Sequence, residues 1–187
     1  MKELSLNVLD ITENSVKAGA TLIRIVIEET DETLTMTVSD NGCGMREDIL
    51  RGVIDPFYTT RTTRKVGLGI PLLKLAAEQT GGSIRITSRH QSEYPDDHGT
   101  ETSALFYKNH IDFTPMGDII STVTTLIQGS PEIDFEFLHT APQFSVELST
   151  RQMREILGEE VPLNDPEIIR WIAQFMKEQY ENITNNE

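Results

Sequence analysis

Three polar side chains on one short segment, Asp10, Asn14 and Lys17, could together hold a metal ion and a phosphate chain. Their spacing of four and three residues places them on one stripe of a helix, and residues 4–20 have the periodicity of an amphipathic helix. A carboxylate, a carboxamide and an amine on one rigid element can bind a cation and the phosphates attached to it. The solvated face of an ordinary amphipathic helix has the same pattern, so the stripe alone leaves both interpretations open.

Two pairs of glycines further along the chain point to contact between backbone and ligand. Gly42 and Gly44 lie in a loop, beginning at Asp40, that follows an expected strand ending at Ser39, and Gly67 and Gly69 precede an expected helix. Glycine allows the backbone to approach a ligand where a Cβ atom would collide. The helix that follows the second pair also offers free N–H groups to an anion. Neither pair is specific alone, because no Gly-Lys-Ser/Thr follows to complete a phosphate-binding loop.

Hydrophobic periodicity predicts the elements that position these residues. The expected elements before residue 109 are a helix over 4–20, a hairpin of strands 21–28 and 34–39, helices 46–53 and 68–80, and strands 83–89 and 99–107. Between the two glycine pairs, residues 55–66 contain four threonines and three basic residues with no clear period. That composition predicts a mobile loop beside the site.

The order of these pieces is more specific than any one of them. Residues 1–108 resemble the GHKL nucleotide-binding family, which includes DNA gyrase, the heat-shock chaperone ATPases, histidine kinases and MutL-type mismatch-repair ATPases. The segments ENSVKAGATLIRI and DNGCGM look like the mismatch-repair branch. The segment DPFYTTRTTRKVGLGIPLLKLAAEQTGGSIRI looks like the catalytic domain of histidine kinases. The resemblance implies an α+β fold of the Bergerat type, a two-layer α/β sandwich whose mixed, largely antiparallel sheet carries helices on one face.

The resemblance also implies roles for the first polar residues. Asn14 matches the family's Mg²⁺ ligand, and Asp10 falls where the hydrolytic branches have a glutamate general base. An outer-shell partner of the metal is the alternative for Asp10, because aspartate has a shorter reach. Lys17 matches a basic position near phosphate, with a solvated lysine as the alternative. Asp40 matches the aspartate that accepts a hydrogen bond from the adenine amino group and disfavours guanine.

The other residues expected at the ATP site lie on the glycine motifs, on one later strand and on the loop of residues 55–66. The resemblance implies that this loop is the lid of the ATP site. The lid aromatic could equally be a hydrophobic anchor, and Met45 could equally be a core residue. At least one basic lid residue is expected to meet the triphosphate, because a lid that closes over anions needs mobile cations. The complete set is Gly42, Gly44, Met45, Phe57, Arg61, Arg64, Lys65, Gly67, Leu68, Gly69 and Thr100.

The net charge of −14 is unevenly distributed along the 187 residues. Residues 1–110 hold 12 basic against 16 acidic residues, a net of −4, whereas residues 111–187 hold 4 against 14, a net of −10. An acidic surface repels phosphate backbones and anionic lipids, so neither nucleic acid nor a membrane is an expected partner. Without a long apolar run the protein is expected to be cytoplasmic. The single cysteine, Cys43, excludes an internal disulfide.

Residues 109–187 are expected to form a small acidic α/β unit that is either appended to the sheet or extends it. Helices are predicted at 116–128, 149–157 and from Asp165 onward, with a hairpin at 133–148. None of the four histidines lies in the helical acceptor setting of a histidine kinase. The resulting prediction is a Mg-ATP-binding protein of signal transduction, acting as an ATPase or as a phosphotransfer subunit on a separate protein.

Two other functions remain open at this stage. One is a regulatory module of the anti-sigma-factor type that binds ATP without meaningful turnover. The other is a conformational ATPase clamp, which would form ATP-dependent dimers. The first prediction and the regulatory module both require a protein partner, either a phosphoacceptor or a protein that is regulated.

Overall fold

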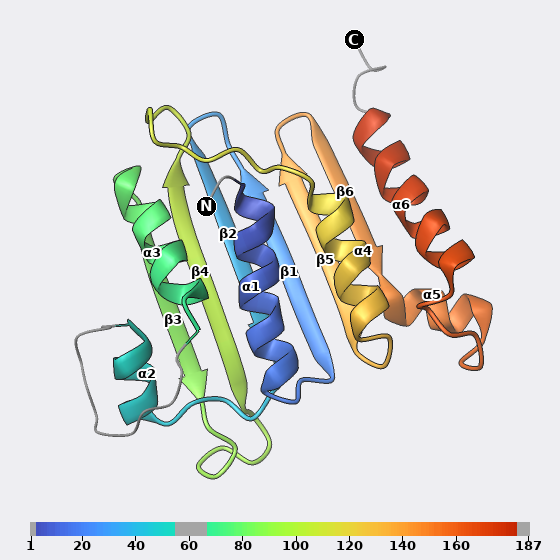
Figure 1. The fold of residues 1–187 in the computed structure, drawn as a ribbon, viewed down its shortest axis with the longest axis horizontal. Coiled ribbons are helices and arrows are strands. Elements are labelled where there is room, and N and C mark those ends of the chain that lie inside the picture. Colours follow the sequence, from blue (N-terminus) through green and yellow to red (C-terminus); the bar gives the residue numbers. More distant parts are fainter. Residues whose placement is uncertain (1–2, 55–66, 183–187) are drawn as a thin grey trace.

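Strands from both halves of the chain form one six-stranded sheet in the order β3-β4-β2-β1-β5-β6 (Figure 1). The computed structural model describes residues 3–54 and 67–182. The strands are β1 (Leu22–Glu29), β2 (Thr33–Asp40), β3 (Ser83–Arg89), β4 (Gly99–Tyr107), β5 (Asp134–Ala141) and β6 (Phe144–Ser149). Neighbouring strands are antiparallel except β1 and β5, which run parallel. The prediction of a mixed, largely antiparallel sheet is therefore confirmed.

Helices α1, α3 and α4 lie side by side on one face of this sheet (Figure 1). The helices are α1 (Leu4–Lys17), α2 (Glu47–Ile54), α3 (Gly69–Gln79), α4 (Ile119–Gly129), α5 (Thr150–Leu157) and α6 (Pro166–Glu181). Strand alternation explains the layering, because Ile23, Ile25 and Ile27 are buried whereas Arg24 between them is exposed. The core lies between the helices and this apolar side of the sheet, as the two-layer prediction required.

One helix begins later than its apolar pattern indicated. Residues 116–128 were expected to be helical, but α4 starts at Ile119. Asp118 caps it, since its carboxylate accepts a hydrogen bond of 2.9 Å from the Ser121 N–H. Gly117 has a φ of +75°, outside the helical region. Capping geometry therefore decides the boundary, and Met116 lies in the connection before it.

The C-terminal residues continue the sheet. β5 pairs with β1 through seven residue pairs, from Leu22 opposite Asp134 to Glu28 opposite Thr140, and β6 forms the outer edge. On the helical layer, α4 packs beside α1 and contributes Val123 and Ile127 to the core. The division of the chain into units 1–108 and 109–187 stays a prediction.

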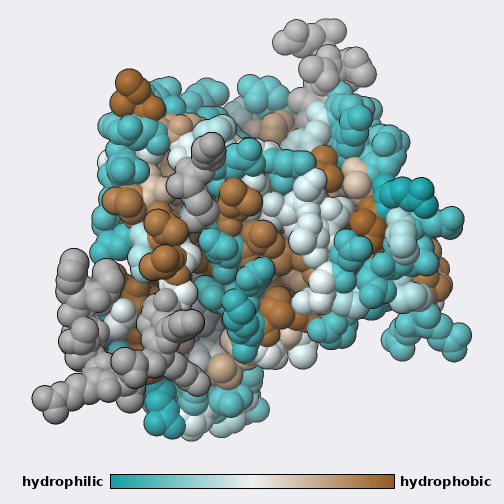
Figure 2. Space-filling model, in the orientation of Figure 1, coloured by the Kyte–Doolittle hydropathy of each residue, from teal (hydrophilic) through white to brown (hydrophobic). Residues whose placement is uncertain are grey.

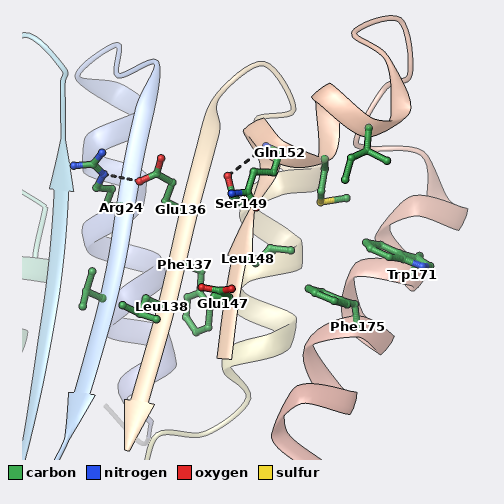
Figure 3. Close-up of a pocket in the computed structure, with 13 residues that line it drawn as sticks. Arg24, Glu136, Phe137, Leu138, Glu147, Leu148, Ser149, Gln152, Trp171 and Phe175 are labelled. Atoms are coloured by element: carbon green, nitrogen blue, oxygen red, sulfur yellow. Dashed lines mark hydrogen bonds and ion pairs between the residues drawn. The ribbon is translucent and has the colours of Figure 1, made fainter. Parts of the chain in front are cut away.

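Helix α6 is held against the edge strand β6. The Gln179 carboxamide accepts a hydrogen bond from the Glu147 N–H at 3.0 Å and donates one to the Glu147 carbonyl at 2.9 Å. Gln179 thus pairs with the edge backbone as a neighbouring strand would, which covers part of that edge. Trp171 and Phe175 of α6 then lie beside β6 (Figure 3).

Apolar side chains are exposed on the helical face, over α1 and α3 (Figure 2). The large exposed apolar residues of these helices and the turn before α3 are Leu6, Leu68, Leu72 and Leu75. Within the described ranges, none of the helices combines the length and apolar character that crossing a membrane requires.

Candidate functional site

The loop after β2 holds Asp40 in a fixed orientation. Ser15 on α1 donates a hydrogen bond of 2.5 Å to one carboxylate oxygen of Asp40, and the Gly42 N–H donates one of 2.9 Å to the other. A carboxylate offers about four acceptor positions, so Asp40 keeps capacity for a further donor. The side chain is half-buried at the border of a polar hollow of about 530 Å³, which Ser88, His98 and Thr100 also line.

Two glycines allow this loop to pass between α1 and β3. A Cβ atom on Gly42 would lie 2.8 Å from the Cβ of Ala18, at the end of α1. At Gly44 the φ angle is +68°, and a Cβ atom would lie 1.9 Å from the carbonyl oxygen of Arg89. Both positions exclude a side chain, the first by contact and the second by contact and backbone conformation. Packing against protein thus explains these glycines before any ligand is considered.

Ser88 at the end of β3 connects the loop to β4. Its hydroxyl accepts a hydrogen bond from the Met45 N–H at 2.7 Å and is hydrogen-bonded to the Thr100 hydroxyl at 2.8 Å. His98 anchors the loop from the other side, since its Nδ1 donates to the Gly42 carbonyl at 2.6 Å. Met45 itself packs against the hydrophobic core. Residues of α1, of β3, of the β3–β4 loop and of β4 therefore all lie around the loop that carries Asp40.

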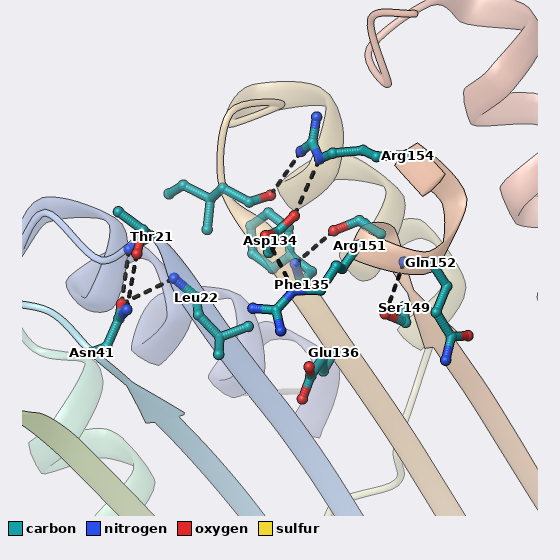
Figure 4. Close-up of polar contacts among 12 residues, drawn as sticks. Thr21, Leu22, Asn41, Asp134, Phe135, Glu136, Ser149, Arg151, Gln152 and Arg154 are labelled. Carbon is teal, nitrogen blue, oxygen red and sulfur yellow. Dashed lines mark hydrogen bonds and ion pairs between the residues drawn. The ribbon is translucent and has the colours of Figure 1, made fainter. Parts of the chain in front are cut away.

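Asn41 joins the same loop to the start of β1 (Figure 4). Its carboxamide oxygen accepts hydrogen bonds from the backbone N–H groups of Thr21 and Leu22, each at 2.9 Å. The Thr21 carbonyl accepts in turn from the Asp134 N–H at 2.9 Å, where β5 begins. The Asp134 carboxylate is paired with Arg154 of α5 at 3.1 Å. The loop of Asp40 is thereby linked to the C-terminal part of the sheet.

The polar stripe of α1 faces inward along most of its length. Asn7, three residues before Asp10, extends the stripe toward the start of α1 and is 0% exposed. Asp10 and Asn14 are half-buried, and Lys17 at the end is exposed. This burial contradicts the interpretation of the stripe as a solvated face. Lys17 lies on the outer surface, where it pairs with Glu13 at 3.5 Å.

The start of α3 lies against this stripe. A Cβ atom on Gly69 would be 3.1 Å from the Cβ of Asp10, and one on Gly67 would be 4.0 Å from the side-chain oxygen of Asn14. The residue that precedes the helix, Leu68, provides no side-chain cap. Free N–H groups at the start of α3 therefore lie near the carboxylate and the carboxamide of α1.

The surroundings of Asp10 disfavour the charged form of its carboxyl group. Burial raises its pKa above the ordinary value, the charge of Glu13 raises it further, and Lys17 opposes both. Its carboxylate makes no hydrogen bond to any other described residue, and neither does the carboxamide of Asn14. These side chains have unused donors and acceptors at the point where α1 meets α3.

The structure brings most of the expected site residues to one end of the sheet. Gly69 and Gly67 lie beside Asp10 and Asn14, and Gly42 and Thr100 lie beside Asp40. Gly44 and Met45 continue the loop after Asp40, and Leu68 immediately precedes α3. Four expected residues lie outside the described residues, namely Phe57, Arg61, Arg64 and Lys65. No group of three or more His, Cys, Asp or Glu side chains within the described ranges could hold a metal ion.

Sequence reasoning missed three residues that hold the loop. Ser88 could have been found, because it follows Ile84 and Ile86 on one face of an alternating strand and is the polar member of that series. Ser15 occupies a similar place on the apolar side of α1. His98 carried no such signal, because its partner is a backbone carbonyl 56 residues away.

Comparison with known proteins identifies the class to which this fold and site belong. The family described as "Histidine kinase-, DNA gyrase B-, and HSP90-like ATPase" matches residues 2–111. The chain belongs to this family, and the predicted resemblance is confirmed.

Sequence relatives within the family are sensor kinases. The tetrathionate sensor histidine kinase TtrS of Salmonella typhimurium is 34% identical over 80 residues, which are 43% of this chain and 13% of that protein. A probable C4-dicarboxylate sensor kinase of Bacillus subtilis is 33% identical over 84 residues, 45% of this chain and 15% of that protein. The chain therefore matches only a small part of the length of these relatives.

A solved structure supports the fold over a larger share of the chain. The Aquifex aeolicus MutL ATPase domain complexed with ADP matches with a TM-score of 0.51 and 14% identity, and the match covers 84% of this chain and 69% of that one. The sequence relatives and the structural neighbour thus come from the two branches that the sequence resembled.

Proposed function

We propose that this chain binds Mg-ATP where α1, α3 and the loop after β2 meet, and that it acts as an ATPase or as a phosphotransfer subunit for a separate protein. Family membership supports nucleotide binding. The observation that carries the proposal is the fixed Asp40 carboxylate, which Ser15 and the Gly42 N–H orient while further acceptor capacity remains. A carboxylate held in this orientation accepts a hydrogen bond from the exocyclic amino group of adenine and is repelled by the carbonyl of guanine.

The phosphates would lie between α1 and the start of α3. Free N–H groups at that helix start attract an anion, and the Asn14 carboxamide supplies an oxygen ligand suited to Mg²⁺. A Mg²⁺ ion held there by Asn14 would offset the negative charge of the phosphates. Asp10, one turn before Asn14, would orient a water or an acceptor hydroxyl and take its proton, a role that a raised pKa favours.

Asp40→Asn tests the nucleotide site. We expect ATP affinity measured by calorimetry to fall by about 10- to 100-fold, because a charge-assisted hydrogen bond contributes about 1.5–3 kcal/mol. The preference for ATP over GTP should fall with it. The matched control is Asp96→Asn, at an exposed aspartate of the β3–β4 loop, which should leave affinity unchanged. Unchanged ATP affinity in a folded Asp40→Asn protein would refute the site.

Asp10→Asn separates an enzyme from a regulatory binding module. We expect phosphate release to fall by about 10²–10⁴-fold while ATP affinity persists, since general base catalysis contributes on that order. The regulatory module remains the second candidate because Asp10 is an aspartate, whose reach is short. Wild-type protein that binds ATP but shows no turnover, alone or with partners, would favour that module.

A further inference from the structure

A groove of about 490 Å³ lies on the face of the sheet opposite α1 and α4, between the strands β1, β5 and β6 and the helices α5 and α6 (Figure 3). The apolar residues of its lining on which the argument rests are Val26, Leu138, Met153, Ile156, Trp171 and Phe175. The groove is separate from the nucleotide site, which lies under the helices of the other face. Its lining comes mainly from residues after 109, to which the proposed function assigns no role.

The groove presents large apolar side chains in a fixed arrangement. Trp171 is 54% exposed and stacks on Phe175, with ring centroids 5.2 Å apart and planes 6° from parallel. Ile156 on α5 is 83% exposed. The double hydrogen bond between Gln179 and the backbone of Glu147 holds α6 in place. Exposed aromatic anchors on a preformed surface are typical of protein-binding sites.

Among the described residues, the charged side chains of the lining are two acidic residues and one basic residue. The basic residue, Arg24, pairs with Glu136 at 2.6 Å. Glu147 lies in the middle of the groove, across from Phe175 (Figure 3), and its carboxylate forms no ion pair within the described part of the chain. On α5, the turn after it and the first half of α6, four exposed carboxylates outnumber the exposed basic residues Arg151 and Arg170, and they form an acidic rim: Glu155, Glu159, Glu160 and Glu167.

We infer that this groove binds an amphipathic helix of a partner protein, with apolar residues on the face that enters the groove and Lys or Arg on its flanks. The apolar face would pack on the Trp171–Phe175 ridge, whose members lie one helical turn apart, and the cations would meet Glu147 and the acidic rim. A second copy of this chain fits poorly, because it brings a net charge of −14 to an acidic surface. The inference deepens the proposed function in its phosphotransfer form, which requires a protein partner. It does not depend on bound nucleotide.

The chain contains a built-in reporter, because Trp171 is its only tryptophan. Two synthetic peptides of about 18 residues, long enough for about five helical turns, serve as probes. Both carry leucines at helical spacing, one with lysines and the other with glutamates at the remaining positions. We expect the lysine peptide to shift Trp171 emission to shorter wavelength with saturation in the micromolar range, and the glutamate peptide to have no effect.

Two variants matched in charge locate the binding. Ile156→Asp, at an exposed groove residue, should lower the affinity for the lysine peptide by at least about tenfold. Ile111→Asp, at a residue that is 94% exposed and does not line the groove, should leave its affinity unchanged. Glu147→Lys should also lower the affinity for the lysine peptide. All of these measurements are made without ATP, so a failure of the nucleotide site leaves the test intact.

Three results would overturn the inference. The first is no emission change with either peptide, and the second is equal affinity in the Ile156→Asp and Ile111→Asp variants. The third is a concentration-dependent dimer in sedimentation that Ile156→Asp abolishes, because the groove would then hold a second copy of the chain.

Discussion

Where β1 and β4 end, hydrogen bonds link Lys108, Glu29, His139 and Tyr180 in one continuous chain. At the opposite end of the sheet, the side chains of Asp10 and Asn14 form no hydrogen bond to any other described residue. His139 Nε2 donates to one oxygen of Glu29 at 2.8 Å, and Lys108 donates to the other at 2.7 Å. The other ring nitrogen of His139, Nδ1, is hydrogen-bonded to the Tyr180 hydroxyl at 2.7 Å. Every polar side chain of this cluster therefore forms a hydrogen bond to another residue of the chain.

The pKa values of the two carboxyl groups express this difference. Hydrogen bonds from His139 and Lys108 lower the pKa of Glu29 to about 2, against the opposing effect of burial. Burial raises the pKa of Asp10 and the charge of Lys17 opposes it, but none of the described residues donates a hydrogen bond to its carboxylate. The first carboxylate is stabilised by folding and the second is destabilised by it. A region that keeps polar groups for a ligand is therefore less stable on its own than one that consumes them.

The largest expected effect on stability comes from neutralising Glu29, and the same change at Asp10 provides the comparison. Each substitution removes the charge of a carboxylate and keeps the shape of the side chain. Glu29→Gln should lower the free energy of unfolding by about 3 kcal/mol at pH 7, because the favourable pairing of its charge is lost. Asp10→Asn should leave it unchanged or raise it by up to about 1 kcal/mol. Urea unfolding monitored by circular dichroism measures both. Equal destabilisation by the two substitutions would remove the contrast between the two ends.

Acid unfolding sharpens the same contrast. Since the pKa of Glu29 falls from 4.5 to about 2 on folding, its contribution is complete above about pH 5. That contribution disappears as the pH falls toward 2, for a loss of about 2–3 kcal/mol. The Glu29→Gln protein should show a shallower decline over this interval. Parallel curves for the two proteins would mean that another group dominates acid unfolding.

Tyr180 tests how far the network extends into the C-terminal helix. Tyr180→Phe removes the hydrogen bond to His139 and should lower the free energy of unfolding by about 1 kcal/mol, the net contribution of one hydrogen bond. Burial and the Glu29 charge raise the pKa of Tyr180, so the hydroxyl stays a donor at neutral pH. Tyr107→Phe, at an exposed tyrosine, is the control and should change stability little. A cost near zero for Tyr180→Phe would confine the network to Glu29, Lys108 and His139.

The two ends also differ in how much of them sequence reasoning could recover. The nucleotide end depends on short motifs such as Asp40 with Gly42 and Gly44, whose spacing survives in a linear pattern. The alternation of the strands likewise predicted the layers. In contrast, Glu29 and His139 are 110 residues apart, and nothing local indicates that β5 lies parallel to β1. Strand pairing is decided by the packing of whole elements, which no single segment encodes.

The smallest expected effect on stability concerns Thr12, a buried polar residue of α1. Thr12 is fully buried, and its hydroxyl has no hydrogen-bond partner among the described residues. Thr12→Val keeps the shape and removes the unpaired hydroxyl, so it should raise the free energy of unfolding by about 0.5–1 kcal/mol. Thr12→Ala, which leaves a small cavity instead, should lower it. If Thr12→Val destabilises the protein, the hydroxyl has a partner, and α1 then satisfies its buried polar groups as the Glu29 cluster does. ATP affinity measured on the same variants would show whether that stability is separate from binding, as the contrast between the two ends requires.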